Sequence, residues 1–161
     1  MGAPSGDQMH RFDTKRQSQT AALLCAALIV ACGSDEEEIA SACTEGPGAV
    51  RSALRDAPGS VRLGGAPLSD CLSEEADGGE LQLVGTSFVE AAAGLAPSAR
   101  RRPQGRAALE LGYLMGAARR GGRSTQGVHT ELLRRLEQEL AGVDRGSPTY
   151  RRGERAGRTE G

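Results

Sequence analysis

The chain has few aromatic or amide side chains, and its cationic residues are almost all of one kind. Its 161 residues include no tryptophan or asparagine, two phenylalanines, two tyrosines, and a single lysine beside nineteen arginines. A single-stranded nucleic-acid groove stacks bases on aromatic side chains set among basic ones, so this shortage argues against a nucleic-acid partner. The preference for residues with GC-rich codons indicates a GC-rich genome, and the number of arginines is therefore no sign of phosphate binding.

Motifs for catalysis or for metal binding are missing too. The sequence has no Gly-x-Ser-x-Gly elbow, phosphate loop, dinucleotide fingerprint or Cys-x-x-Cys pair. His129 could form a zinc site only with Cys43, Cys71 and a carboxylate, at spacings that match no ligand pattern. The acidic stretch Ser73–Glu80 lacks the alternating ligands of a calcium loop. We expect no catalytic residue, metal or cofactor, and expect His129 to be a solvated or capping residue near a helix start.

Charge is distributed unevenly along the chain. Residues 33–90 carry three arginines against twelve acids, a net charge of −9, whereas residues 91–161 carry fourteen arginines against seven acids, a net charge of +7. Such asymmetry can indicate an anionic partner for the basic half. Mutual attraction of the two halves within one fold explains it equally well, and without interleaved aromatics we favour the internal explanation.

One long apolar run, "AALLCAALIVA" at Ala21–Ala31, follows the basic residues Arg11, Lys15 and Arg16. As a helix these residues would span about 17 Å, well short of the roughly 30 Å hydrocarbon core of a bilayer. A basic start, an apolar stretch of this length and small residues after it are typical of a secretory signal peptide. We therefore interpret residues 1–31 as a signal peptide rather than a transmembrane helix.

The end of this run, Ile29-Val30-Ala31-Cys32, resembles the lipobox of bacterial lipoproteins. The resemblance implies that the Cys32 thiol receives a diacylglyceryl group and that cleavage makes Cys32 the new N-terminus. Two acyl chains hold a protein stably on a membrane. The chain would then be a lipid-anchored protein on the extracytoplasmic side of the cell membrane or the outer membrane. A packed N-terminal core helix and an uncleaved signal anchor remain the alternatives.

Behind Cys32 the pattern predicts an all-α fold, a small bundle of about four short helices. We expect the lipidated cysteine and an acidic tether at 32–46, a helical domain at 47–143 and a disordered basic tail at 144–161. Four stripes at helical spacing support the bundle: they run from Val50 to Ala57, from Leu81 to Leu95 with an end at Pro97, from Ala107 to Ala118, and from Leu132 to Leu140. Only "SVRL" at 60–63 and "LQLV" at 81–84 suggest strands.

Two sequence features predict how this core, which has few aromatic side chains, is stabilised. Ala108, Gly112 and Gly116 recur every four residues and indicate a close helix–helix crossing within the core in preference to an oligomer contact. Cys43 and Cys71 form an even pair in an exported chain, which predicts a disulfide. The chain-entropy estimate for a loop of this length is roughly 3.5 kcal/mol. Two free buried thiols are the alternative.

From these observations we expect a noncatalytic, membrane-anchored envelope lipoprotein whose helical module is structural or binds an unidentified envelope protein. The alternative is an envelope enzyme or ligand carrier, which a pocket lined by His129, Glu90 and Tyr113 would favour. The densest basic cluster, Ala99–Arg106, is expected to be a solvated linker between helices, with contact to phospholipid headgroups as its alternative.

Overall fold

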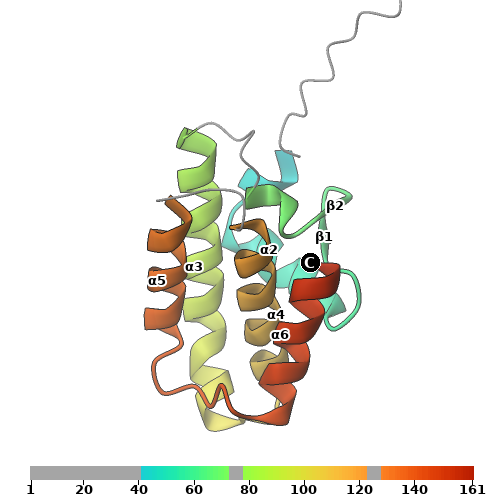
Figure 1. Ribbon diagram of the computed structural model, residues 1–161, viewed down its shortest axis with the longest axis vertical. Coiled ribbons are helices and arrows are strands. Elements are labelled where there is room, and N and C mark those ends of the chain that lie inside the picture. The colour runs from blue at the N-terminus through green and yellow to red at the C-terminus, as the bar shows by residue number, and fades with distance from the viewer. Residues whose placement is uncertain (1–40, 73–77, 123–127) are drawn as a thin grey trace, which may run out of the picture. The chain divides into compact units, whose positions relative to one another are not determined.

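A computed structural model describes residues 41–72, 78–122 and 128–161, and in these ranges the chain is mostly helical. Residues 37–161 form one compact unit. The predicted signal peptide, Cys32 and most of the tether lie outside the described residues. The elements, shown in Figure 1, are η2 (Ser41–Thr44), α2 (Pro47–Ala53), η3 (Leu54–Asp56), β1 (Arg62–Leu63), β2 (Ala66–Pro67), η4 (Asp70–Leu72), α3 (Gly78–Arg101), α4 (Arg106–Gly121), α5 (Val128–Glu139) and α6 (Pro148–Glu160).

Helix α4 is the central element of this unit. It lies between α3 and α6, while α5 packs on α3 (Figure 1). Helices α3 and α5 run in one direction, and α4 and α6 run in the other. Every residue of α4 from Ala108 to Ala118 is buried, as expected for a helix covered on all sides. The predicted all-α class is confirmed, with five α-helices rather than four in the described part of the chain.

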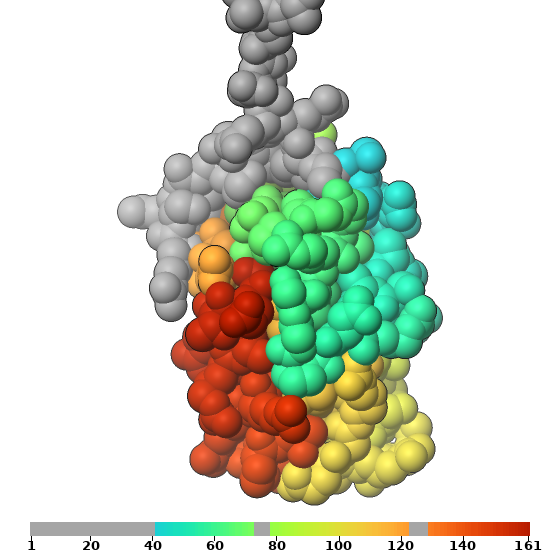
Figure 2. All heavy atoms as spheres, turned by 90° about the vertical axis from the view of Figure 1, so that its right-hand side faces the viewer, coloured from blue at the N-terminus to red at the C-terminus, as the bar shows by residue number. Residues whose placement is uncertain are grey.

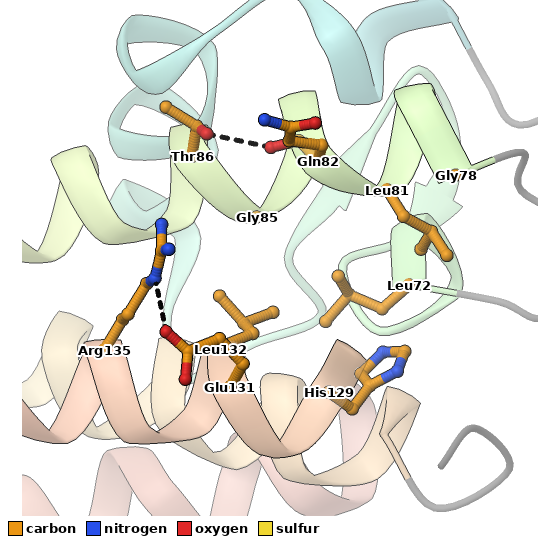
Figure 3. A pocket seen from close by; sticks show the side chains of 10 residues that line it. All are labelled: Leu72, Gly78, Leu81, Gln82, Gly85, Thr86, His129, Glu131, Leu132 and Arg135. Atoms are coloured by element: carbon orange, nitrogen blue, oxygen red, sulfur yellow. Dashed lines mark hydrogen bonds and ion pairs between the residues drawn. The ribbon is translucent and has the colours of Figure 1, made fainter. Parts of the chain in front are cut away.

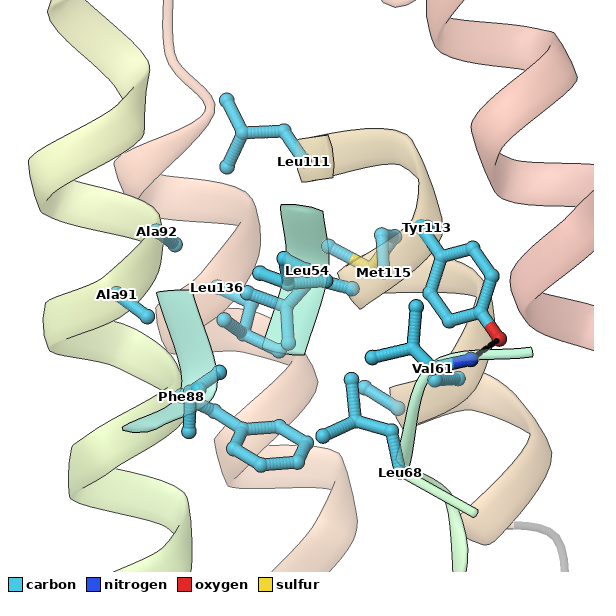
Figure 4. Close-up of a cluster of buried hydrophobic side chains, with 14 of the residues drawn as sticks. Leu54, Val61, Leu68, Phe88, Ala91, Ala92, Leu111, Tyr113, Met115 and Leu136 are labelled. Carbon is cyan, nitrogen blue, oxygen red and sulfur yellow. Dashed lines mark hydrogen bonds between the residues drawn. The ribbon is translucent and has the colours of Figure 1, made fainter. Parts of the chain in front are cut away.

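The hydrophobic core fills the space between these helices and the segment that precedes α3. Its largest side chains are fully buried, and Figure 4 shows them converging from α3, α4, α5 and the stretch 54–68. They include Leu54, Val61, Leu68, Phe88, Leu111, Tyr113, Met115 and Leu136. Full burial of a side chain of this size is worth about 1.5–3 kcal/mol relative to exposure. The four predicted apolar stripes all contribute to this core.

Helix α3 continues beyond Pro97, where we expected it to end. Proline lacks an N–H and its ring crowds the carbonyl of the preceding turn, so it usually breaks a helix. Here Ala96 and Ala99, on either side of it, are 1% and 0% exposed, whereas Pro97 itself is exposed. Packing of the alanine face against the core therefore outweighs the local cost, and the helix reaches Arg101.

The prediction of a disordered tail at 144–161 is wrong, because residues 148–160 form helix α6. The Ser147 side chain caps its start by accepting a hydrogen bond from the backbone N–H of Tyr150 at 3.2 Å, and Pro148 occupies a favourable first-turn position. The buried residues of α6 are Tyr150, Gly153 and Gly157. Apolar periodicity is therefore a poor guide to this helix, whose buried face is mainly backbone.

Helices α4 and α6 pack through glycines on both sides. A Cβ on Gly112 would overlap the carbonyl oxygen of Tyr150, and one on Gly116 would overlap that of Glu154. From the other side, a Cβ on Gly157 would overlap the carbonyl oxygen of Tyr113. Small residues every four positions allow such backbone contact. The predicted close crossing at Gly112 and Gly116 is thus confirmed, and its partner is α6.

Arginine side chains satisfy the carbonyl groups at two helix ends. Arg100 of α3 donates from Nε to the Ala141 carbonyl and from Nη2 to the Glu139 carbonyl, each at 2.8 Å, where α5 ends. Arg120 of α4 donates to the Thr159 carbonyl at 2.6 Å, where α6 ends. The last carbonyls of a helix lack partners in the helix and attract cations. These two arginines therefore have structural roles.

A short hairpin covers one side of the bundle. Strands β1 and β2 pair antiparallel, with Leu63 opposite Ala66, through Gly64 and Gly65, whose φ angles of 57° and 92° suit a two-residue turn. The space-filling view places this segment beside α6 (Figure 2), where the Ser69 hydroxyl donates to the Gly161 carbonyl. The strand suggested at 60–63 is therefore present in part, whereas 81–84, the other suggestion, belongs to α3.

Candidate functional site

A groove of about 640 Å³ lies between α3 and α5, close to η4. This volume is in the range of small-molecule sites, about 300–1,000 Å³. Figure 3 shows the side chains around it, with leucines toward one another in the middle and an ion pair toward one end. The lining residues are Leu72, Gly78, Leu81, Gln82, Gly85, Thr86, His129, Glu131, Leu132 and Arg135.

The two helices contribute to the groove through faces that differ in chemistry. The lining residues of α3, from Gly78 to Thr86, fall on one face at a spacing of three or four residues, and two of them are glycines. A Cβ on Gly85 would lie 3.7 Å from Cδ1 of Leu132, so this position has room for a methyl group. Because glycine adds no side chain here, the face of α3 leaves space in front of α5.

On the α5 side, Glu131 is held by two arginines. Arg134 donates from Nε to Oε2 at 2.8 Å and from Nη2 to Oε1 at 2.7 Å, while Arg135 donates from Nε to Oε1 at 2.8 Å. The hydrogen bonds from Arg134 and then from Arg135 lower the pKa of Glu131 to about 2. At neutral pH the three side chains therefore carry one net positive charge at the rim of the groove.

His129 stands in the first turn of α5 and is only 2% exposed. The expectation of a solvated histidine is therefore wrong, because the His129 side chain is buried. A Cβ on Gly122 would lie 3.0 Å from Cδ2 of this ring, so the end of α4 approaches the imidazole closely. Because helix α5 places His129 below α3 and beside Leu72, the ring forms one end of the groove (Figure 3).

The grouping of His129 with Glu90 and Tyr113, which would have favoured an enzyme or carrier, is not formed. Glu90 is exposed and does not line the groove. The Tyr113 hydroxyl is buried elsewhere, where it accepts a hydrogen bond from the backbone N–H of Val61 at 3.0 Å. Burial raises the pKa of Tyr113. The residues that share the groove with His129 are Gln82, Thr86, Glu131 and Arg135 instead.

The two cysteines predicted to pair form a disulfide. Cys43 in η2 and Cys71 in η4 have Cα atoms 5.6 Å apart, a normal separation for this bond, and both are buried in the core. The bond closes a loop with a sequence separation of 28. Cys43 falls in the stretch expected to be tether, and its burial places the start of the folded domain at or before Ser41.

The basic cluster at Ala99–Arg106 joins α3 to α4 at the end of the bundle away from η2 (Figure 1). Three of its arginines bond to the protein itself, and Arg101 does so only through the nearby Ser98 hydroxyl at 3.3 Å. Arg100 binds the end of α5, as described above, and Arg106 pairs with the buried Glu110 at 3.0 Å and donates to the Arg55 carbonyl. Only residues 102–105 of the predicted linker lie between the helices, because α3 reaches Arg101 and α4 begins at Arg106. The arginines on both sides of this short link make specific contacts rather than being fully solvated.

Sequence reasoning missed four polar residues of the groove: Gln82, Thr86, Glu131 and Arg135. Their signal is available only in part, since Glu131 and Arg135 stand four residues apart, the spacing of an ion pair that supports a helix. Nothing local to the sequence reports that α5 packs beside the glycine face of α3. Within the described ranges, no group of three or more acidic, histidine or cysteine side chains could hold a metal ion. Cys32, the predicted lipidation residue, and the acids at 74, 75 and 77 lie outside those ranges.

No family model, curated protein or solved structure matches this chain. None of the helices in the described ranges is both long enough and apolar enough to cross a membrane.

Proposed function

We propose that this protein is a bacterial envelope lipoprotein, anchored to the membrane through a diacylglyceryl group on Cys32 and exposing its helical domain on the extracytoplasmic side. Support comes from the lipobox-like sequence Ile29–Cys32 at the end of an apolar run of signal-peptide length. Residues 33–40 would connect the lipid to the folded domain that is described from Ser41 onward. Two acyl chains suffice for stable attachment.

The observation that carries this proposal is the disulfide between Cys43 and Cys71. Disulfides persist in exported proteins and are rare in the reducing cytosol. Here the bond ties the first described turn of the domain to the segment before α3. A disulfide that fixes the first described turn to the rest of the fold is typical of a small exported domain, and such a domain is compatible with a lipid anchor.

The proposed role of the domain is noncatalytic binding of an envelope protein or of the envelope itself. Among the described residues that line the groove, Glu131 is the one carboxylate, and its state supports a binding role over acid–base chemistry. Glu131 titrates near pH 2 and is held by Arg134 and Arg135. A general acid or base needs a pKa near the working pH, and this carboxylate is far from it.

A second candidate function, a carrier of a small ligand, is favoured by the groove between α3 and α5. Its volume of about 640 Å³ and its mixture of leucines with polar side chains at the rim are features of ligand sites. This candidate is compatible with the anchor, since the described residues that line the groove all lie between Leu72 and Arg135, within the helical domain.

Fractionation of a bacterial host that expresses the full chain tests the anchor. The wild-type protein should sediment with membranes and enter the detergent phase on Triton X-114 partition. A Cys32→Ala variant should lose the lipid and move to the aqueous phase, whereas a Cys25→Ala variant should behave as wild type, because Cys25 lies inside the apolar run. Wild-type and Cys32→Ala proteins that partition alike would overturn the proposal.

A further inference from the structure

The groove between α3 and α5 has a distinct apolar part and a distinct cationic rim. Leu72, Leu81 and Leu132 enclose the apolar part, with His129 at its far end (Figure 3). Gly78 and Gly85 line it without side chains, so it can hold ligand atoms. A site that combines an apolar body with a few polar groups at one end suits an amphiphilic molecule.

Arg135 supplies the cationic rim. It bonds Glu131 through Nε alone, and the described residues offer no other acceptor to its guanidinium. Its side chain is 59% exposed, and its two Nη groups remain available to a ligand. Arg134, in contrast, uses both Nε and Nη2 on Glu131 and does not line the groove. Arg135 is therefore the arginine that can donate hydrogen bonds to a bound molecule.

The charge balance at this rim favours an anion. Glu131 is ionised at neutral pH, but two guanidiniums face its one carboxylate and leave an excess of one positive charge. Helices α3 and α5 are parallel, and their N-terminal ends lie together at the Gly78 and His129 end of the groove, away from Arg135 (Figure 3), so the positive charge at the rim comes from the arginines rather than from the helix dipoles.

We propose that this groove binds a single acyl chain that ends in an anionic head group, with the head on the Nη groups of Arg135 and the chain between Leu132, Leu81 and Leu72. The inference rests on the ligand-carrier candidate and specifies its ligand class. Each further methylene that such a chain buries in the groove should tighten binding about fourfold. The carboxylate of a fatty acid and the phosphate of a lysophospholipid share the chemistry that Arg135 would recognise.

Calorimetric titration of residues 37–161, the compact unit that contains the whole described core, tests this assignment without detergent. The protein is produced with its disulfide intact, and its helix content and thermal melt are checked first. Decanoate, neutral decanol and decyltrimethylammonium are the three probes, each used below its aggregation concentration. Lysophosphatidylglycerol is then titrated against decanoate, to distinguish a phosphate head from a carboxylate head.

Three variants separate the contribution of Arg135 to binding of the head group from the contribution of the apolar groove to binding of the chain. Arg135→Gln should weaken decanoate binding about tenfold, the value of one charge-assisted contact, while leaving decanol binding unchanged. Arg134→Gln is the matched control, because it removes the same charge and a partner of Glu131 but does not line the groove, and it should weaken decanoate binding clearly less than Arg135→Gln does. Gly85→Leu should abolish binding of both probes by filling the groove.

We expect saturable binding of one decanoate per chain and weaker binding of decyltrimethylammonium. Equal effects of Arg134→Gln and Arg135→Gln, or a cationic probe that binds as tightly as decanoate, would overturn the assignment of an anionic head. In that event, loss of decanol binding in Gly85→Leu would still support a carrier. If no probe binds saturably, both the acyl-chain assignment and the carrier candidate are overturned. The lipid anchor is tested separately, by the Cys32→Ala variant.

Discussion

Gly153 of α6 lies directly against the backbone of Leu109 in α4, so close that a Cβ on Gly153 would overlap the Leu109 carbonyl oxygen and lie 2.9 Å from the Tyr113 backbone nitrogen. Both neighbours are main-chain atoms of a buried helix, and no side-chain rotation can relieve the overlap. The contact explains how a helix with few apolar side chains is held in the fold.

Gly153→Ala is therefore expected to destabilise the domain by about 3 kcal/mol, at the upper end of typical overpacking. Gly112→Ala should have a similar effect, because it meets the same interface from α4. Gly48→Ala, in α2, is the control: its added Cβ would have no neighbour within 4 Å, and the change should stabilise by about 0.5–1 kcal/mol. Urea unfolding gives these differences, and equal stability of all three variants would disprove the close α4–α6 contact.

The disulfide gives a second prediction. Replacing Cys43 and Cys71 together by serine should lower the free energy of unfolding by about 3–4 kcal/mol, since it releases a closed loop in the unfolded chain. A reducing agent should lower the melting temperature of the wild type and leave the double variant unchanged. A wild-type melting temperature that is insensitive to reduction would show that the bond is absent or energetically unimportant.

The hydroxyl of Tyr113 ties the hairpin to the central helix by accepting the hydrogen bond from Val61. Tyr113→Phe should cost about 1–3 kcal/mol, because it leaves a buried backbone N–H without its partner. Val61, at 0% exposure, has no access to water as a substitute. Hydrogen exchange at the Val61 amide is the specific measurement, and exchange as slow as in the wild type would contradict the proposed role of this hydroxyl.

Stability should fall at alkaline pH, partly through Tyr150. Burial, helped by the nearby Glu154 carboxylate, raises the pKa of Tyr150 to about 12. An exposed tyrosine in the unfolded chain titrates near 10. Stability that is fully present below pH 10 is therefore lost as the pH rises toward 12, since the unfolded chain releases a proton that the folded chain retains. Tyr150→Phe should flatten this slope, and an unchanged slope would contradict the assignment.

The comparison of α4 with α6 shows what the sequence could predict. Leucines, alanines and Met115 give α4 an apolar stripe, and its glycine strip correctly indicated a close crossing. Helix α6 has no such stripe, because its buried face is glycine beside a single tyrosine. Its signal was a complementary pattern: Gly153, Gly157 and Gly161 repeat the four-residue spacing of Ala108, Gly112 and Gly116, and Ser147-Pro148 supplies a helix start.

The groove could be predicted only in fragments, because it depends on which helices become neighbours. Leu81 and Leu132 belonged to predicted apolar stripes, and Glu131 stands at the i,i+4 spacing of an ion pair with Arg135. That α5 runs parallel to α3 and faces its glycines is a property of the tertiary fold. Pro97 illustrates the same limit, since buried alanines on both sides of it decide that α3 continues.

The proposed lipid anchor on Cys32 is tested most directly by the intact mass of the protein purified from the membrane fraction of a bacterial host. We expect loss of residues 1–31 and the added mass of a diacylglyceryl group on Cys32, with further acylation of the new N-terminus where the host performs it. The Cys32→Ala variant should carry neither modification. A full-length, unmodified chain recovered from the cytosol would contradict the lipoprotein assignment.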